Sequence, residues 1–242
     1  MLSRIPMLCY HRIETPPASH PGDQNFVTPE RFGTHLSMLA ALGYRGVTVR
    51  EIVHWQRGEG VLPARPIAIT FDDAYDSVVR HALPTLTARG WRCTVFAVTT
   101  CVGKSNVWDP SAPRATLLDA AALRALHDAG HEVGSHSRRH RRITTLSAAE
   151  AADELAGSRR ELEAMMGAPV TSFAFPYGTH DRITLDRVRD AGYSAACTLK
   201  RWGNGRRTNP LRFGRMGVGG PLRDWQLAAK LLKMLVTPAF ES

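Results

Sequence analysis

Two histidines lie four residues apart in the stretch GSHSRRHRR, which covers residues 134–142. If His136 and His140 share one helical turn, they face the same way and can hold one metal ion. A basic run that contains histidines is equally typical of a solvated surface or of a patch that binds a polyanion. The rest of the chain has to decide between a metal site and a basic patch.

Paired aspartates supply the acidic groups that such a metal site needs. Asp72 and Asp73 directly follow the apolar run PIAITF at 66–71. One carboxylate would complete a set of two histidines and one aspartate with an open position for water, and the other would act as a general base beside the metal. An Asp-Asp pair after a strand is also a common helix cap, so the pair alone leaves both interpretations open.

Two further groups follow predicted strands in the same way. His11 comes after IPMLCY at 5–10, and Tyr177, in the sequence FPYG, comes after VTSFAF at 170–175. Taken alone, His11 is more typical of a satisfied core or rim histidine, and FPYG of a turn. In α/β barrels the functional groups gather at the carboxyl ends of the strands, so the joint occurrence of these groups favours an active site.

Short apolar runs alternate with helical patterns along the chain, and this order predicts a parallel sheet covered by helices. The predicted strands are 5–10, 66–71, 92–98, 131–135, 170–175 and 193–199. The predicted helices are 29–42, 74–89, 119–129, 147–166, 181–191 and 224–236, with caps at Asp119 and at Ser147 paired with Glu150. We therefore expect an α/β fold: one domain over 1–242, a distorted or incomplete (β/α) barrel of about seven β/α units.

The charge and cysteine content bound the class of partner and compartment. Lys and Arg exceed Asp and Glu by 31 to 22, a net charge of +9 that favours acidic partners. The four cysteines include no Cys-x-x-Cys pair, and the N-terminal residues lack the apolar core of a signal peptide. These features predict a cytoplasmic protein, at most peripheral to the inner membrane surface.

The segment at 224–240 bears on a membrane contact, and the motifs that are absent bear on the class of enzyme. DWQLAAKLLKMLVTPAF mixes an apolar stripe with lysines, which predicts either a helix that covers the barrel or a contact with an anionic membrane surface. No Gly-x-Ser-x-Gly, His-Glu-x-x-His or P-loop motif occurs, so serine-hydrolase, zincin and P-loop chemistry lose their main support. The aromatic residues, 7% and scattered, form no stacking platform, and no nucleic-acid partner is expected.

Taken together, the motifs resemble those of the polysaccharide deacetylases with a NodB-type domain (carbohydrate esterase family 4). ITFDDAYDS resembles the first motif of that family, GSHSRRH the second and FAFPYG the third. The resemblance implies a catalytic base at Asp72 and metal ligands at Asp73, His136 and His140. It also implies that Tyr177 binds substrate, with its backbone N–H directed at the acetyl oxygen.

Three positions depart from the family pattern. Ala74 replaces a glycine, Ala174 or a neighbour replaces the arginine that orients the base, and no histidine after His180 supplies the late catalytic acid. The segment LCYH resembles the N-terminal histidine motif of the bacterial poly-N-acetylglucosamine deacetylases, whose motif order is circularly permuted, and this implies His11 as the acid. Arg215, in RFGRMGV, is the candidate for the missing arginine.

The resemblance implies a metal-dependent hydrolase that removes the N-acetyl group from an N-acetylhexosamine-containing saccharide, giving acetate and a free amino sugar. Its cofactor would be one divalent ion: zinc, with cobalt, nickel or manganese as alternatives. The arginines of GSHSRRHRR suggest a phosphate-linked precursor as substrate, because guanidinium groups suit phosphate. Two alternatives stay open: a deformylase or other amidase acting on a lipid- or nucleotide-linked sugar, and a catalytically decayed barrel that binds a polyanion.

Overall fold

Parallel strands form the central sheet of the computed structural model, which describes residues 4–220 and 222–237. The strand order is β10-β1-β5-β6-β7-β8-β9, and β4 pairs with β5 beside this path. The strands are β1 Met7–Tyr10, β4 Arg45–Val47, β5 Pro66–Phe71, β6 Thr94–Ala97, β7 Glu132–Ser135, β8 Ser172–Ala174, β9 Ala195–Cys197 and β10 Met216–Gly217. A second small sheet pairs β2 Arg12–Ile13 with β3 Phe26–Val27.

The sheet curls into a distorted barrel whose ring is completed by a short segment before β10. Cys197 at the end of β9 forms a single parallel bridge with Phe213, and β10 then pairs with β1. Residues 213–217 therefore stand between the two edges of the curled sheet. The predicted (β/α) barrel is confirmed, and its closure is weakest at this seam.

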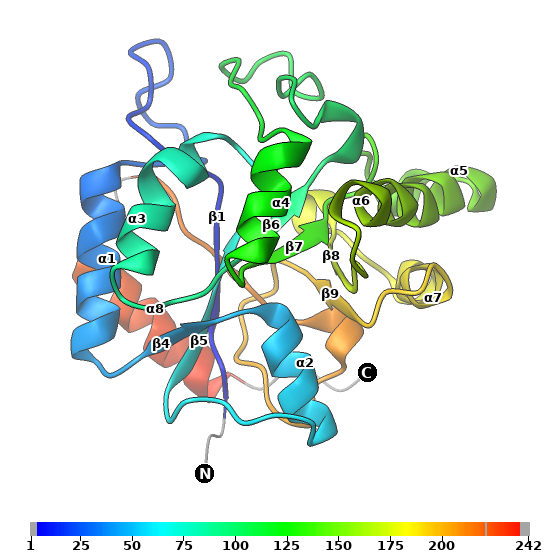
Figure 1. Cartoon of the computed structure of the whole chain (residues 1–242). Coiled ribbons are helices and arrows are strands. Elements are labelled where there is room, and N and C mark those ends of the chain that lie inside the picture. Colours follow the sequence, from blue (N-terminus) through cyan, green and yellow to red (C-terminus); the bar gives the residue numbers. More distant parts are fainter. Residues whose placement is uncertain (1–3, 221, 238–242) are drawn as a thin grey trace.

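Helices surround the barrel, with α1, α3 and α8 on one side and α4 to α7 on the other (Figure 1). They are α1 Pro29–Ala41, α2 Val49–Arg57, α3 Leu83–Thr87, α4 Ala120–Asp128, α5 Ala148–Ala152, α6 Ser158–Met166, α7 Arg182–Asp190 and α8 Asp224–Val236. Two π-helical segments, Val78–Ala82 and Asp153–Gly157, precede α3 and join α5 to α6. Short 3₁₀ turns lie at Thr99–Cys101, Ile143–Thr145, Pro176–Gly178 and Pro210–Arg212. No helix in the described ranges is long and apolar enough to cross a membrane.

The predicted elements are found with shifted ends, and five elements were missed. The caps at Asp119 and at Ser147 with Glu150 are present. The missed elements are the short strands β2, β3, β4 and β10 and the helix α2, although α2 carries a capping box of Thr48 with Glu51. The helix predicted from 74 begins only at 78, because the backbone directly after β5 turns through positive φ angles.

Side-chain alternation along the strands explains which residues meet above the barrel. Strand residues fall into a cluster beneath the helices, which includes Ile67 and Ile69, and a cluster inside the barrel, which includes Ala68. Because successive side chains point to opposite faces, the inward row of β5 continues from Ala68 to Asp72. By the same rule the inward row of β1 ends at His11.

The missed helix α2 closes the amino-terminal end of the barrel. Its apolar residues Val49, Ile52 and Val53 belong to the inner cluster. Two side chains on neighbouring strands cap its N-terminus: Thr94 Oγ1 accepts from Val49 N at 3.0 Å, and buried Glu132 accepts from Arg50 N at 2.8 Å. The opposite end, where the strands finish, lies beneath the long loops at 14–25 and 101–117 (Figure 1).

Candidate active site

Asp72 and Arg215 form a buried, two-pronged ion pair at the carboxyl end of β5. Arg215 Nη1 donates to Asp72 Oδ1 at 2.6 Å, and Nη2 donates to Oδ2 at 2.8 Å. Arg215 is 0% exposed, and it also donates to Thr70 Oγ1 and to Thr198 O. Burial alone would raise the pKa of Asp72, but the Arg215 guanidinium outweighs it and holds that pKa below its ordinary value. The pair gives an ionised carboxylate with a fixed orientation.

Asp73, His136 and His140 bring three ligand atoms together beside this pair. Asp73 Oδ1 lies 3.6 Å from His136 Nε2 and 3.4 Å from His140 Nε2. Each of the three residues is buried, and the three ligand atoms lie within 4.8 Å of one another. His136 Nδ1 contacts Ala174 O at 2.8 Å, which leaves Nε2 of that ring facing the cluster. The structure therefore brings together the three predicted ligands.

The chemistry of this cluster fits a divalent metal ion. Asp73 Oδ1 is buried without a hydrogen-bond partner, which is costly unless something else satisfies it. Burial, and then the neighbouring Asp72 charge, raises the pKa of Asp73, so the carboxylate needs a nearby cation to ionise easily. Burial lowers the pKa of His136 to about 4 and that of His140 to about 2, so both rings are neutral and able to donate lone pairs.

The two histidines converge through a loop, which corrects the helical turn that the spacing predicts. Residues 136–142 contain no helix, and Ser137 and His140 have φ angles of 66° and 57°. The segment 99–100 holds the loop from one side, where Thr100 N donates to Arg138 O at 3.0 Å. The spacing of four residues between the two histidines correctly predicted a shared site, but the backbone that brings them together is irregular.

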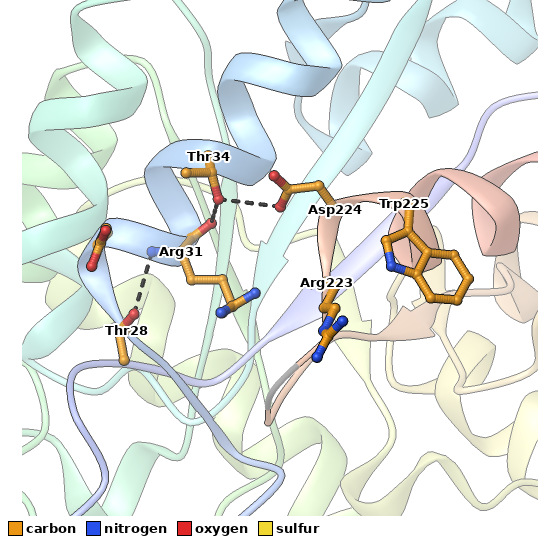
Figure 2. Close-up of a pocket in the computed structure, with 7 residues that line it drawn as sticks. Thr28, Arg31, Thr34, Arg223, Asp224 and Trp225 are labelled. Atoms are coloured by element: carbon orange, nitrogen blue, oxygen red, sulfur yellow. Dashed lines mark hydrogen bonds between the residues drawn. The ribbon is translucent and has the colours of Figure 1, made fainter.

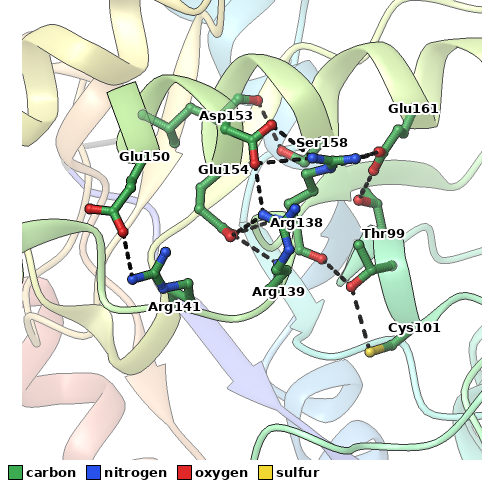
Figure 3. A network of polar contacts seen from close by, with 12 residues as sticks. Thr99, Cys101, Arg138, Arg139, Arg141, Glu150, Asp153, Glu154, Ser158 and Glu161 are labelled. Atoms are coloured by element: carbon green, nitrogen blue, oxygen red, sulfur yellow. Dashed lines mark hydrogen bonds and ion pairs between the residues drawn. The ribbon is translucent and has the colours of Figure 1, made fainter. Parts of the chain in front are cut away.

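A network of acidic side chains fixes this loop from the other side (Figure 3). Fully buried Glu154 accepts from the backbone N–H groups of Arg138 and Arg139 at 2.9 and 2.8 Å, and from the Arg139 guanidinium at 3.1 Å. Arg138 also bonds Asp153 at 2.7 Å and Glu161 at 2.7 Å. These arginines hold the loop that carries His136 and His140 in place, and their charge is largely neutralised by the chain's own carboxylates.

The remaining two arginines of the run differ in their surroundings. Arg141 pairs with Glu150 at 3.0 Å on the exposed surface. Arg142 lies over the ring of Tyr177, 4.4 Å from its centroid. Of the four arginines that suggested a phosphate, only Arg142 therefore reaches the rim of the site without a carboxylate partner among the described residues.

His11 and Tyr177 both lie at the site. The side chains of Cys9, His11 and Asp72 form a second compact group with ligand atoms within 4.8 Å, in which the Cys9 thiol donates to Asp72 Oδ2 at 3.2 Å. Burial lowers the pKa of His11. The half-exposed Tyr177 ring packs edge-on against His140, with the ring centroids 4.8 Å apart.

Trp108 is a site residue that sequence reasoning missed. Its indole stacks on the His140 ring with a centroid distance of 4.8 Å and an interplanar angle of 28°. Together with Tyr177, whose ring also packs against His140, it forms an aromatic wall beside that histidine. The signal was a lone tryptophan in a loop rich in Pro and Ser, which offers no periodic pattern that would place it.

Backbone strain is concentrated at this site. In the described chain five residues other than glycine have positive φ, and all belong to the three motifs: Asp73, Ala74, Ser137, His140 and Tyr177. Ala74, at the position where the family pattern has glycine, has a φ of 58°. Such conformations cost of order 1–3 kcal/mol each and persist where the surroundings enforce them, typically at functional sites.

Comparison with known proteins agrees with this arrangement. A family model described as polysaccharide deacetylase matches residues 59–196, more than half of the chain. The Bacillus subtilis (strain 168) protein YxkH, whose name assigns it to the polysaccharide deacetylases, is 23% identical over 198 residues. That match covers 82% of this chain, and the chain spans 65% of the length of that relative.

Solved structures share the fold over nearly the whole chain. IcaB from Ammonifex degensii is 26% identical, with a TM-score of 0.78 over 94% of this chain and 96% of that one. The Streptococcus pyogenes deacetylase PplD, solved in complex with acetate, has a TM-score of 0.81 at 17% identity, and the match covers 97% of this chain and 99% of that one. At 17% identity the second likeness shows the fold alone.

Proposed function

This chain belongs to the polysaccharide deacetylase family, and from that premise we propose that it is a metal-dependent hydrolase which removes the N-acetyl group from an N-acetylhexosamine-containing saccharide. The observation that carries the proposal is the Asp72–Arg215 pair beside the cluster of Asp73, His136 and His140. An oriented carboxylate next to a set of two histidines and one aspartate is the equipment that amide hydrolysis by an activated water requires.

Each residue has a role in this proposal. Asp73, His136 and His140 would hold a divalent ion, zinc before cobalt, nickel or manganese; when bound, such an ion polarises a carbonyl and lowers the pKa of water. Asp72 would accept the proton of the attacking water, because Arg215 keeps its carboxylate ionised and fixes its orientation.

His11 would protonate the departing sugar nitrogen. An amine anion is a very poor leaving group, so this nitrogen has to be protonated as the C–N bond breaks. Burial lowers the pKa of His11, so the resting ring is neutral and would have to gain the proton that it delivers. Asp72, whose ligand atom lies within 4.8 Å, would supply the proton that it takes from the water. The products are acetate and a free amino sugar.

The aromatic wall would bind the saccharide. Trp108 and Tyr177 present apolar ring faces beside His140, where a sugar ring can pack. The Tyr177 backbone N–H would donate to the acetyl oxygen, and a single donor of this kind contributes about 3 kcal/mol to transition-state stabilisation. A phosphate on the substrate would rely on Arg142, since the other three arginines of the run bond the chain's own carboxylates.

The non-enzymatic alternative loses most of its support. It rested on the net charge of +9 and on two missing family features, the base-orienting arginine of the third motif and the late catalytic histidine. Arg215 bonds the base from a different part of the chain, and Arg138, Arg139 and Arg141 are ion-paired. Neither observation favours a barrel without catalysis.

Acetate release from N-acetylglucosamine oligomers tests the proposal. The wild-type protein loaded with zinc is expected to release acetate, while Asp72→Asn retains the metal and loses turnover, and His136→Ala loses both. Asp76→Asn, which removes a carboxylate from an exposed pair with Arg80, is the control and should remain active. N-formyl and phosphate-linked analogues assayed in parallel separate deacetylation from the alternative amidase reactions. Undiminished acetate release by Asp72→Asn would contradict the mechanism.

A further inference from the structure

Helix α8 has an inner apolar face that fixes it to the barrel. Leu227, Leu231 and Met234 are at most 2% exposed and belong to the core. This confirms that α8 is a barrel-covering helix, as one of the two predictions for 224–240 stated. Residues 238–240 of that predicted segment lie outside the described residues.

The same helix carries a second apolar stripe on its outer side. Trp225, Leu232 and Val236 are 65%, 66% and 75% exposed, and exposed Ala229 lies between them. The intervals from 225 to 229, 232 and 236 are four, three and four residues, which places all four side chains along one side of the helix. A helix that only covers a barrel needs one apolar face, and α8 has two.

Cations without partners border this outer stripe. Arg223, Lys230 and Lys233 are exposed, and within residues 4–220 and 222–237 none of them forms an ion pair with a carboxylate. By contrast, Arg138, Arg139 and Arg141 in the loop at 136–142 each pair with a carboxylate. The outer surface of α8 therefore combines an apolar stripe with uncompensated positive charge.

The first turn of α8 is held firmly against α1, so the stripe starts from a fixed support (Figure 2). Thr34 Oγ1 bonds Asp224 Oδ1 at 3.2 Å, and Arg31 Nη1 donates to Leu222 O at 3.2 Å. Arg31, Thr34 and Asp224 line a pocket together with Trp225, whose indole points away from Thr34 in Figure 2. The tryptophan is thus presented outward at one end of the stripe.

We infer that the outer face of α8 docks on an anionic phospholipid surface. Tryptophan favours the boundary between headgroups and acyl chains, and an apolar stripe bordered by lysines lies in the plane of a membrane with its cations among the headgroups. Negative lipid charge complements Arg223, Lys230 and Lys233, as it does the overall charge of +9. The inference is independent of the reaction catalysed, because none of these residues belongs to the proposed active site.

Vesicle co-sedimentation of the full chain tests this inference. We expect binding to vesicles of phosphatidylcholine with phosphatidylglycerol, little binding to phosphatidylcholine alone, and weaker binding at high salt. Two variants separate the contributions: Leu232→Asp removes the centre of the stripe, and Lys230→Glu with Lys233→Glu reverses the border charge. Each is expected to weaken the apparent affinity for anionic vesicles by at least about tenfold.

Matched controls on α7 make the result specific. Ile183 is 61% exposed, so Ile183→Asp makes the same chemical change on another helix, and Arg182→Glu with Arg189→Glu reverses two charges there, one of which pairs with Asp186. These controls should bind vesicles like the wild type, and circular dichroism should show that every variant is folded. Absence of binding to anionic vesicles, or equal loss in the α7 controls, would overturn the inference. So would a dimer that Leu232→Asp dissolves without any vesicle binding, because the stripe would then be a contact between copies.

Discussion

The loop at 136–142 and helix α8 are both basic segments with apolar neighbours, yet the protein uses their charge in opposite ways. In the loop, Arg138 and Arg139 bond Asp153, Glu154 and Glu161, and the backbone passes through positive φ angles. In α8 the backbone is regular, and the cations form no ion pair within the described chain. The charge of the loop forms ion pairs that fix the shape of the loop, whereas the charge of α8 faces solvent.

The difference shows that net charge alone says little about a partner. A count of basic residues treats the two segments alike, and the arginine-rich loop looks the stronger candidate for an acidic ligand. The loop arginines Arg138, Arg139 and Arg141 are compensated by carboxylates that lie 9 to 23 residues further along the chain. At α8, by contrast, Arg223, Lys230 and Lys233 pair with no carboxylate among the described residues, and they remain available to an external surface beside the apolar stripe.

Among the variants that test this comparison, removal of the Glu154 carboxylate should have the largest effect on stability. Glu154→Ala deletes the buried acceptor of two backbone N–H groups and one guanidinium, so we expect it to reduce the free energy of unfolding by roughly 2–4 kcal/mol. The loop should then lose its fixed shape and retain less metal. Urea unfolding and the metal content of the folded fraction measure both effects.

Asp186→Ala on α7 is the control for Glu154, since its pair with Arg189 is about half exposed. It should unfold close to the wild type and retain its metal. If Glu154→Ala were as stable as this control, the buried network would not be what holds the loop.

Arg215 is a third kind of arginine, since it is fully buried and pairs with Asp72 inside the barrel. Arg215→Lys keeps a positive charge near Asp72 but cannot make two parallel hydrogen bonds, so the carboxylate loses its fixed orientation. We expect kcat to fall on the order of 100-fold with KM and metal content little changed. Arg182→Lys, on the exposed surface of α7, is the control. A large rise in KM at constant kcat would instead assign Arg215 to substrate binding.

Strand patterns and the position of polar groups after them predicted most of the scaffold and the convergence of the site. Asp72, Asp73, His136 and His11 each directly follow a strand of the barrel, and parallel strands bring their carboxyl ends together. That rule needs only local sequence. It explains why the site could be located before its geometry was known.

The remaining features depend on contacts between distant parts of the chain. Arg215 reaches Asp72 across 143 residues, so the sequence named it only as a candidate for the missing arginine and could not place it beside Asp72. The irregular loop that carries His140 is held by Glu154, which lies on the predicted helix at 147–166 and reads there as an ordinary surface position. Helix α2 was missed for a different reason, since its capping box is visible in the sequence but stands beside a strand of only three residues.

A substitution by glycine should stabilise the protein in the loop at 136–142 and destabilise it in helix α8. Ser137 has a φ of 66° and a buried hydroxyl without a partner, so Ser137→Gly relieves a left-handed backbone and is expected to stabilise the protein by about 1 kcal/mol. Ala229 lies exposed inside regular α8, so Ala229→Gly should destabilise it by about 1 kcal/mol. Thermal unfolding of both variants measures the difference, and a shift of the same sign in both would show that the loop is not strained.

Removal of one exposed cation from each segment should give the smallest difference in thermal stability. Arg141 is paired with Glu150 at 3.0 Å, whereas Lys230 has no carboxylate partner among the described residues. Arg141→Ala should therefore lower Tm by no more than about 2 °C at low salt and not at all at high salt, where the pair is screened. Lys230→Ala should leave Tm unchanged at both, because it breaks no pair. A loss of stability in Lys230→Ala would mean that the folded chain itself uses this charge, and α8 would then have less positive charge to offer a lipid surface.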